Sequence, residues 1–523
     1  MTETAPNILL IMVDQMAAPA LPIYGHRIVQ APNITSLGET GVIFDNAYCN
    51  FPLCAPSRFS MLSGRLPTSI DAFDNASEFP ASIPTLPYYL ESFGYVTKLC
   101  GKMHFIGPDQ LHGYRERLTT DVYPSDFAWT PDWTEGEHSK PSGVSMRSVL
   151  EAGTCVRSLQ LDYDEEVEHC GLQAIYDLAR SPQQQPFFLT ISFSHPHPPF
   201  VITEEYWSRY EHDAIDMPKT PPIPPEQSDA YSQWLHVAHG GDEASVTEEH
   251  VRNARHAYYG MISYIDDKIG RIVKALKETD LYQNTVIVFA GDHGEMLGER
   301  GMWYKQTFFE WSSRVPLIVA QPGVLKPGRR SEVVSLVDLL PTLLDLASGG
   351  DSLSLADPLD GSSMVGLLTG ENESEWPDTA VGEYTAEGVR GPCKMVRTGP
   401  YKYVYTHGYP GQLFNLNDDP HERVNLCGRM EHADAEAKLV ERLFRDWDPD
   451  RITERVLASQ RRRRLIYRAL NEGSDVNWAF AARIGDERRF VRGAGVVVEA
   501  KARSRFPYVE PATNKSSDQL VED

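Results

Sequence analysis

Three continuous apolar runs stand out along the chain, and each of them ends at polar residues. Residues 6–14 end at Asp14, residues 186–193 precede a Ser-His-Pro-His sequence, and residues 285–290 precede a Gly-Asp-His-Gly sequence. Runs rich in Val, Ile, Leu and Phe without alternation are typical of parallel strands that helices cover on both faces. We therefore predict a mostly parallel central sheet with polar groups gathered at the carboxyl ends of its strands.

Amphipathic segments with helical spacing separate and follow these strands. The apolar positions recur at helical intervals in Asp164–Arg180, Ala254–Thr279 and Val334–Leu346, and Pro341 predicts a break or kink in the last of them. Because strand and helix alternate, the pattern indicates an α/β/α sandwich.

From about residue 378 the pattern changes to short strands with tight turns, which predicts a small antiparallel sheet. These strands, and the helix expected after them, are Ala380–Tyr384, Cys393–Thr398, Tyr401–Thr406, Gln412–Asn415 and Ala433–Asp446. We expect three parts: a catalytic α/β/α domain over residues 1–376, a small antiparallel-sheet and helix subdomain over 377–450, and an extended basic tail over 451–523. The tail is expected to serve oligomerisation and to reach the active site.

The composition of the 523-residue chain is that of a globular enzyme, with 41% hydrophobic and 23% charged residues. The net charge of −24 argues against nucleic-acid binding and against attraction to anionic membranes. It also gives an anionic substrate no long-range attraction. Any anion site must therefore be built locally, from basic side chains and metal.

Two features predict a cytoplasmic protein. The apolar run Asn7–Val13 is too short for a secretory segment, and no stretch approaches the ~18 apolar residues of a membrane span. The seven cysteines are an odd number scattered along the chain, which is typical of a reducing compartment and not of a disulfide framework.

The tail differs from the rest of the chain in its charge. Residues 451–505 contain fourteen basic residues against six acidic ones. A basic tail on an acidic body favours docking onto that body or onto a neighbouring subunit. The alternative for Arg461–Arg464 is a solvated helix face.

The most informative stretch is Cys54-Ala-Pro-Ser-Arg58, within residues 52–64. From chemistry alone, Cys54 could be a thiolate nucleophile with Arg58 as its charge partner, or a buried structural cysteine. No His/Asn partnership of a thiol hydrolase accompanies it in the local sequence.

The stretch resembles the signature of formylglycine-dependent sulfatases, which belong to the alkaline phosphatase superfamily. Cys-x-Pro-x-Arg is the core that formylglycine-generating enzymes read, and residues 94–104 resemble the second sulfatase signature. Further matches run from residue 6 to about 425. The resemblance implies an alkaline-phosphatase-like α/β/α sandwich with a small C-terminal sheet, and it makes Cys54 the residue that is oxidised to become the nucleophile.

The family mechanism implies a metal. Oxidised Cys54 hydrates to a geminal diol, one oxygen attacks sulfur, and the other later loses its proton so that sulfate departs and the aldehyde is restored. Such a scheme needs one divalent cation, for which hard oxygen ligands favour Ca²⁺, with Mg²⁺ or Mn²⁺ as alternatives. By resemblance, position 54 and the side chains of Asp14, Asp292 and His293 coordinate it.

The metal-site sequence departs from the commonest sulfatase pattern. Two adjacent aspartates usually follow the first strand, whereas this chain has Asp14-Gln15, and it has Asp292-His293 where many sulfatases have Asp-Asn. This combination resembles choline sulfatases and phosphonate monoester hydrolases. The loss of one carboxylate makes the site less anionic.

The resemblance also assigns roles around the nucleophile. Arg58 and Lys102 resemble the pair that stabilises its oxyanion, and His104 resembles the base that takes the diol proton. His197 and Lys305 resemble the contacts to the sulfate and the leaving group. Asn75 is expected to touch the sulfate or its ester oxygen.

Within the family the chain is most similar to choline sulfatases, as in residues 74–79, residues 382–388 and Arg503–Pro507. A quaternary ammonium needs an aromatic face and carboxylates, which Trp129 and Glu383 could supply. Residues 142–148 lack the His-Asn pair expected there, and Asn477–Ala481 are also altered.

We therefore expect a small-molecule sulfate ester, choline sulfate or an aryl sulfate, as the substrate. The alternatives are a phosphonate monoester or phosphodiester hydrolase on the same scaffold, and a silent binding protein in which Cys54 stays unmodified. The family and the basic tail together suggest a homodimer or homotetramer, with a formylglycine-generating enzyme as a partner during maturation.

Overall fold

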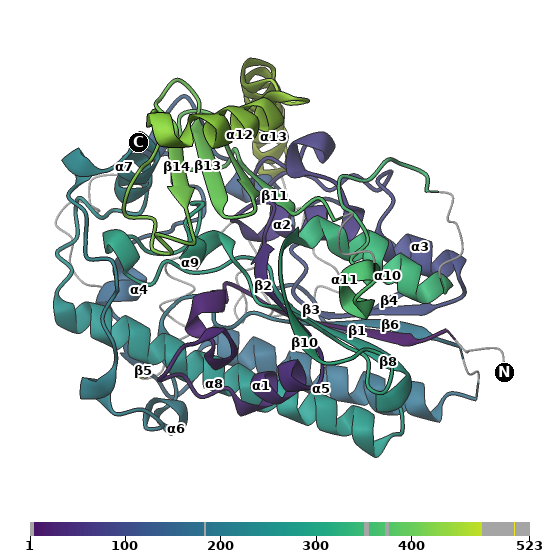
Figure 1. Ribbon diagram of the computed structural model, residues 1–523. Coiled ribbons are helices and arrows are strands. Elements are labelled where there is room, and N and C mark those ends of the chain that lie inside the picture. Colours follow the sequence, from purple (N-terminus) through teal and green to yellow (C-terminus); the bar gives the residue numbers. More distant parts are fainter. Residues whose placement is uncertain are drawn as a thin grey trace.

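The computed structural model describes residues 5–182, 185–349, 355–371 and 376–472, together with residues 478 and 507. Its centre is an eight-stranded sheet in the order β10-β2-β9-β8-β1-β6-β3-β4 (Figure 1). All neighbouring strands in this sheet are parallel except for β9, which is antiparallel to β8 and β2. The predicted mostly parallel sheet is confirmed.

The three apolar runs form neighbouring strands in the middle of this sheet, namely β8 (Thr285–Gly291), β1 (Asn7–Val13) and β6 (Phe187–Phe193). Every residue of the three strands is buried. The other strands are β2 (Val42–Tyr48), β3 (Val96–Gly101), β4 (Glu116–Arg117), β9 (Leu317–Ala320) and β10 (Gly328–Ser335).

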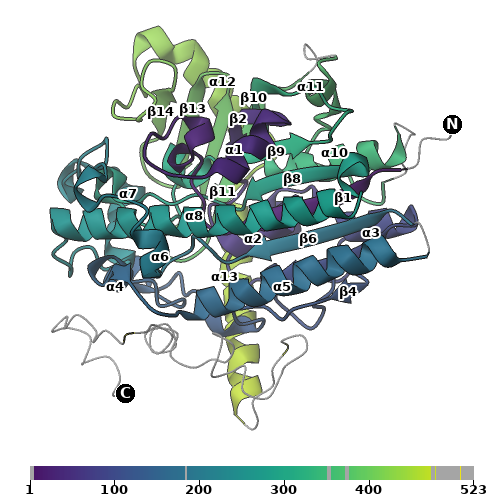
Figure 2. The ribbon, with the colours of Figure 1, turned by 90° about the horizontal axis from the view of Figure 1, so that it is seen from below.

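Helices cover both faces of the sheet (Figures 1 and 2). One face packs against α1 (Pro32–Glu39), α5 (Leu159–Arg180) and α8 (Glu248–Glu278), and the other against α2 (Cys54–Ser63), α3 (Leu86–Ser92), α10 (Leu339–Ser348) and α11 (Val365–Thr369). Alternate residues of β1 belong to the two cores, with Leu9 and Ile11 in one and Ile8 and Leu10 in the other. Two covered faces explain why the run is continuously apolar.

The prediction for Val334–Leu346 was wrong at its beginning. Val334 is in strand β10, and the helix α10 begins only at Leu339. Pro341 therefore lies in the first turn, where backbone N–H groups have no helical acceptor, and it breaks nothing. Ser335 and Asp338 mark the change, because they form a capping box on the short 3₁₀ turn Leu336–Asp338 that leads into α10. Apolar spacing alone runs on across these two residues.

The four short strands form the predicted antiparallel sheet, β11 (Thr379–Tyr384), β12 (Cys393–Thr398), β13 (Tyr401–Thr406) and β14 (Gln412–Asn415). Helix α12 (Ala433–Phe444) packs against β12 and β13. The remaining short elements are α4 (Arg147–Leu150), β5 (Gly153–Thr154), β7 (Val201–Ile202), α6 (Glu204–Trp207), α7 (Ala230–Ala238) and α9 (Glu310–Ser313).

The tail begins with α13 (Pro449–Asn471), which crosses the molecule and projects beyond it (Figure 2). Of the four consecutive arginines at 461–464 only Arg463 is buried, so the expected solvated face holds for the other three. The stretches 477–481 and 503–507 lie outside the described residues, apart from Trp478 and Pro507. Among the described helices, none is both long and apolar enough to cross a membrane.

Candidate active site

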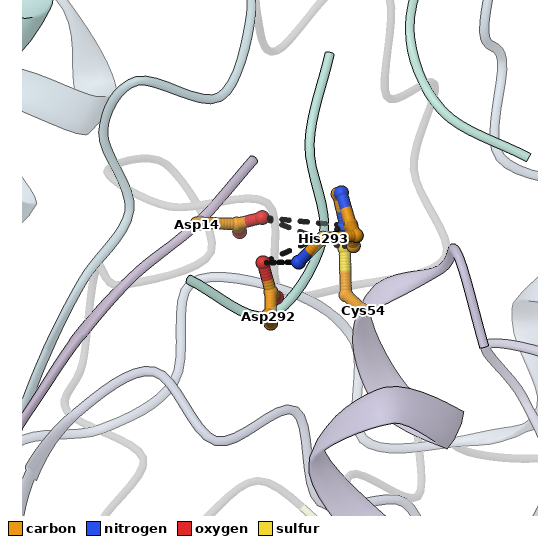
Figure 3. Close-up of side chains that lie close together, drawn as sticks. All are labelled: Asp14, Cys54, Asp292 and His293. Carbon is orange, nitrogen blue, oxygen red and sulfur yellow. Dashed lines mark hydrogen bonds and ion pairs between the residues drawn. The ribbon is translucent and has the colours of Figure 1, made fainter. Parts of the chain in front are cut away.

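Two neighbouring strands deliver the acidic groups of the site. Val13 pairs with Gly291 at the ends of β1 and β8, so the next residues, Asp14 and Asp292, lie side by side. Cys54 is the first residue of α2 and faces them (Figure 3). The ligand atoms of Asp14, Cys54, Asp292 and His293 all lie within 4.8 Å of one another.

These four side chains are fully buried and close together. The Cys54 Sγ lies 3.2 Å from the His293 Nε2 and 3.7 Å from the Asp14 Oδ1. The His293 Nε2 is also 3.6 Å from the Asp14 Oδ1 and 3.7 Å from the Asp292 Oδ1. The other ring nitrogen, Nδ1, lies 3.1 Å from the Gly294 carbonyl, to which it can donate, and this leaves Nε2 as a ligand atom for the cluster.

Both carboxylates remain ionised although they are buried. Burial and the charge of Asp292 act to raise the pKa of Asp14, but Lys102 and further cations outweigh them and hold this pKa at about 2. The pKa of Asp292 is lowered as well, because His293, Arg58 and Lys102 overcome the effect of burial. Two ionised carboxylates, an imidazole nitrogen and the atom at position 54 fit a divalent cation such as Ca²⁺, Mg²⁺ or Mn²⁺.

Two buried cations stand beside this cluster. The Arg58 Nε donates to the Asp292 Oδ2 at 2.8 Å, and its Nη1 donates to the Ser192 Oγ at 2.8 Å. The Lys102 Nζ donates to the Asp14 Oδ2. Each carboxylate therefore has one oxygen held by a fixed positive charge, while its other oxygen faces Cys54 and His293.

His104 lies next to Cys54 in a left-handed backbone conformation, with φ 59°. Asp121 holds that backbone, since its Oδ2 accepts from the His104 amide at 2.8 Å. Burial lowers the pKa of His104, although the nearby Cys54 opposes this effect. Neither ring nitrogen makes a hydrogen bond of good geometry with a described residue.

Opposite His104, a chain of polar contacts ends at Lys305. The Lys305 Nζ lies 2.9 Å from the His197 Nε2 and 2.5 Å from the Gln15 Oε1. The Gln15 amide nitrogen donates to Glu295, and the backbone N–H of Gln15 donates to the Asp292 Oδ1 at 3.0 Å. The amide that stands in place of a second aspartate is therefore directed towards Lys305.

A narrow pocket opens above Cys54. Most of the residues predicted for substrate and catalysis line it, and with them lie several that the sequence did not indicate. The lining residues are Leu53, Cys54, Asn75, His104, Tyr123, Trp129, Ser142, Val144, His197, Lys305 and Glu387.

Comparison with known proteins agrees with this arrangement. The family model for sulfatases matches residues 6–350, and models for the C-terminal regions of N-sulphoglucosamine sulphohydrolase and of choline sulfatase match residues 298–447 and 454–506. The chain belongs to the sulfatase family. It is a sulfuric ester hydrolase with the fold expected of that family.

Relatives of this sulfatase differ in their substrates. It is 40% identical to a choline-sulfatase of Rhizobium meliloti over 97% of this chain and 99% of that protein, and 30% identical to human arylsulfatase K over 81% and 79%. The phosphonate monoester hydrolase of Agrobacterium radiobacter is similar in structure, with a TM-score of 0.66 and 25% identity over 84% and 94% of the chains.

The structure does not bring Glu383 to the pocket of this sulfatase. Its carboxylate accepts from the backbone N–H and the hydroxyl of Thr68, both at 2.9 Å, and lies 3.7 Å from the Lys394 Nζ. The reason is its place in strand β11, where it pairs across the small sheet with Lys394. The pocket carboxylate is Glu387, which follows that strand.

Glu387 is buried and only partly satisfied. Its Oε1 accepts from the Gln306 amide at 3.1 Å and lies 3.4 Å from the Ser142 Oγ, while its Oε2 has no hydrogen-bond partner among the described residues. Burial raises its pKa to about 7. The sequence placed both glutamates in residues 382–388 without a signal to choose between them, and nothing in it singled out Tyr123.

Proposed function

We propose that this sulfatase hydrolyses choline sulfate or a similarly small sulfate ester whose alcohol carries a positive charge. The observation that carries the proposal is the pair of Trp129 and Glu387, an aromatic side chain and a buried carboxylate with a free oxygen, on the wall of one pocket. The π-face of the tryptophan and the negative charge of the glutamate both attract an ammonium group. The full-length similarity to a choline-sulfatase supports it.

In this proposal Cys54 is oxidised to formylglycine, whose hydrate supplies the nucleophilic oxygen. Asp14, Asp292, His293 and position 54 would hold a divalent cation, with Ca²⁺ proposed, which when bound acidifies the attacking hydroxyl and polarises the sulfuryl oxygens. Arg58 and Lys102 keep the two aspartates ionised and oriented, and they supply fixed positive charge next to the developing oxyanion. His104, neutral and adjacent, accepts the proton of the second hydroxyl.

Lys305 is the proposed acid for the leaving alcohol. The His197 Nδ1 lies 2.7 Å from the Pro198 carbonyl, so this nitrogen carries the ring proton and Nε2 accepts from Lys305. The side-chain carbonyl oxygen of Gln15 accepts a second hydrogen bond from the Lys305 ammonium. Lys305 thus keeps one further proton to give to the ester oxygen, while Asn75 and Trp129 bind the rest of the ester.

Lys305→Ala is expected to lower kcat/KM by about a thousandfold for an alkyl sulfate and only about tenfold for an aryl sulfate with a good leaving group, because only the former needs protonation. Across a series of aryl sulfates, the variant should show a steeper dependence of kcat/KM on the pKa of the leaving alcohol than the wild type does. Lys326→Ala, at an exposed lysine, is the control. Equal losses for all esters would contradict the role as an acid.

The experiment that tests the cationic substrate is the pH dependence of KM. Glu387 is neutral below its raised pKa of about 7 and ionised above it. The KM for choline sulfate is therefore expected to fall by up to about tenfold per unit as the pH rises towards 7, and to level off above it. An uncharged aryl sulfate should show no such fall, and Glu387→Gln should remove it. A fall shared by both esters, or kept by Glu387→Gln, would contradict the proposal.

We also propose a maturation and an assembly. All ten residues of α2 are buried, so a formylglycine-generating enzyme must reach Cys54 before the chain has folded. The odd number of cysteines, scattered along the chain, supports a cytoplasmic location. Leu465 and Ile466 on α13 are 61% and 41% exposed, which supports a homodimer or homotetramer in which this helix contacts another subunit.

A further inference from the structure

The tail is joined to the substrate pocket through one arginine. The Arg463 Nη1 and Nη2 donate to the two carboxylate oxygens of Asp74 at 2.6 and 2.7 Å, and Nη1 also lies 3.3 Å from the Thr130 Oγ1. The side chain of Arg463 is 5% exposed and that of Asp74 is fully buried. A buried, bidentate ion pair of this kind fixes both the distance and the relative orientation of its two partners.

Both partners are next to pocket residues. Asp74 precedes Asn75, which lines the pocket and accepts from the Ala55 backbone N–H, next to Cys54, at 2.9 Å. Thr130 follows Trp129, which also lines the pocket. The two loops come from separate parts of the body, and Arg463 is bonded to both of them at once.

Further contacts of α13 lie beside the Arg463–Asp74 ion pair. The Gln460 Oε1 accepts from the Trp133 backbone N–H at 3.0 Å, and the Trp133 indole donates to the Ala386 carbonyl at 2.9 Å, directly before Glu387. Arg464 pairs with Asp132 at the surface. The side of α13 that faces the body therefore contacts the loops of Asn75 and Trp129 directly, and it is linked to the loop of Glu387 through Trp133.

We propose that Arg463 is a positioning residue for substrate binding, which sets the places of Asn75 and Trp129 by holding Asp74 and Thr130 together. The inference rests on the proposed function, in which these two side chains contact the ester. Arg463 itself does not line the pocket and does not contact Cys54 or its ligand cluster. Its loss should therefore weaken substrate binding far more than it slows the chemical step.

The test is a comparison of KM and kcat for Arg463→Lys and wild type, with both enzymes confirmed to carry formylglycine. Lysine keeps the positive charge but lacks the planar guanidinium group. It therefore cannot hydrogen-bond to both oxygens of Asp74 and to the Thr130 hydroxyl at the same time. We expect KM for choline sulfate to rise about tenfold or more while kcat changes less than about threefold. Arg462→Ala, at the adjacent exposed arginine, should retain the wild-type KM.

Asp74→Asn supplies a second variant in case Arg463→Lys folds poorly, and the double variant should raise KM no further than either single one. Variants that melt at a lower temperature but keep the wild-type KM would overturn the inference, because the ion pair would then only stabilise the fold. A wild-type enzyme that hydrolyses an aryl sulfate but not choline sulfate would overturn the proposed substrate instead. In that case a raised KM for the aryl sulfate in Arg463→Lys still supports the positioning role.

Discussion

Replacing Cys54 by alanine is expected to lower kcat/KM for every sulfate ester by at least about ten-thousandfold, because the nucleophile is lost while the binding groups stay in place. The side chain is buried between Asp14 and His293, and no other described cysteine lies in this cluster. The loss should appear in kcat, with KM nearly unchanged. Steady-state kinetics with choline sulfate and with an aryl sulfate measure it.

Cys54→Ser separates the nucleophile from its regeneration. A serine oxygen could accept the sulfuryl group, but it has no second hydroxyl to expel sulfate, so one equivalent of alcohol should be released before the enzyme stalls. Cys170→Ala, at a half-buried cysteine of α5, is the matched control and should keep full activity. Full activity of Cys54→Ala, or unmodified Cys54 in peptides of the active wild-type enzyme, would contradict the proposed nucleophile.

Replacing Asp292 by asparagine is expected to lower kcat/KM by about a thousandfold and to remove most of the bound metal. Asp292 stands at the centre of the site, where it accepts from Arg58 at 2.8 Å and from the Gln15 N–H at 3.0 Å. Asparagine preserves the size of the side chain but removes the charge that a hard cation requires. Metal content per chain and kcat/KM with added Ca²⁺, Mg²⁺ or Mn²⁺ are the two measurements.

The control for this prediction is an aspartate of similar burial away from the cluster. Asp338 is buried, and it accepts from the backbone N–H groups of Ser335 and Ser362 at 2.7 and 2.8 Å. Asp338→Asn should lower stability but leave metal content and KM as they are. If Asp292→Asn keeps both its metal and its activity, the proposed ligand set is wrong.

The sequence was sufficient to predict the structure of a segment where one physical requirement determines its residues. The buried strands β1, β6 and β8 were evident from apolar runs without polar alternation, because a strand covered on both faces is rich in apolar residues on both of them. The side chains at their carboxyl ends follow from the same argument, since adjacent parallel strands end at one edge of a sheet. The beginning of α10 was missed because apolar spacing continues from β10 across the capping residues Ser335 and Asp338, which periodicity alone does not weigh.

Contacts between segments that are far apart along the chain could not be predicted from the sequence. Glu383 and Glu387 are four residues apart in one stretch, and only the end of β11 at Tyr384 decides which of them reaches the pocket. Arg463 could not be told from the arginines beside it, since its partner Asp74 is distant along the chain. Such pairings depend on loop paths, which no local pattern encodes.

The most direct test of the proposed function is a comparison of kcat/KM for choline sulfate, an aryl sulfate and an aryl phosphonate monoester, using protein with confirmed formylglycine at Cys54. The pocket of Trp129 and Glu387 predicts that choline sulfate is preferred over the aryl sulfate by about tenfold or more, with the phosphonate last. A preference for the aryl sulfate would contradict the cationic substrate. A preference for the phosphonate would place the main activity of this site outside sulfate esters.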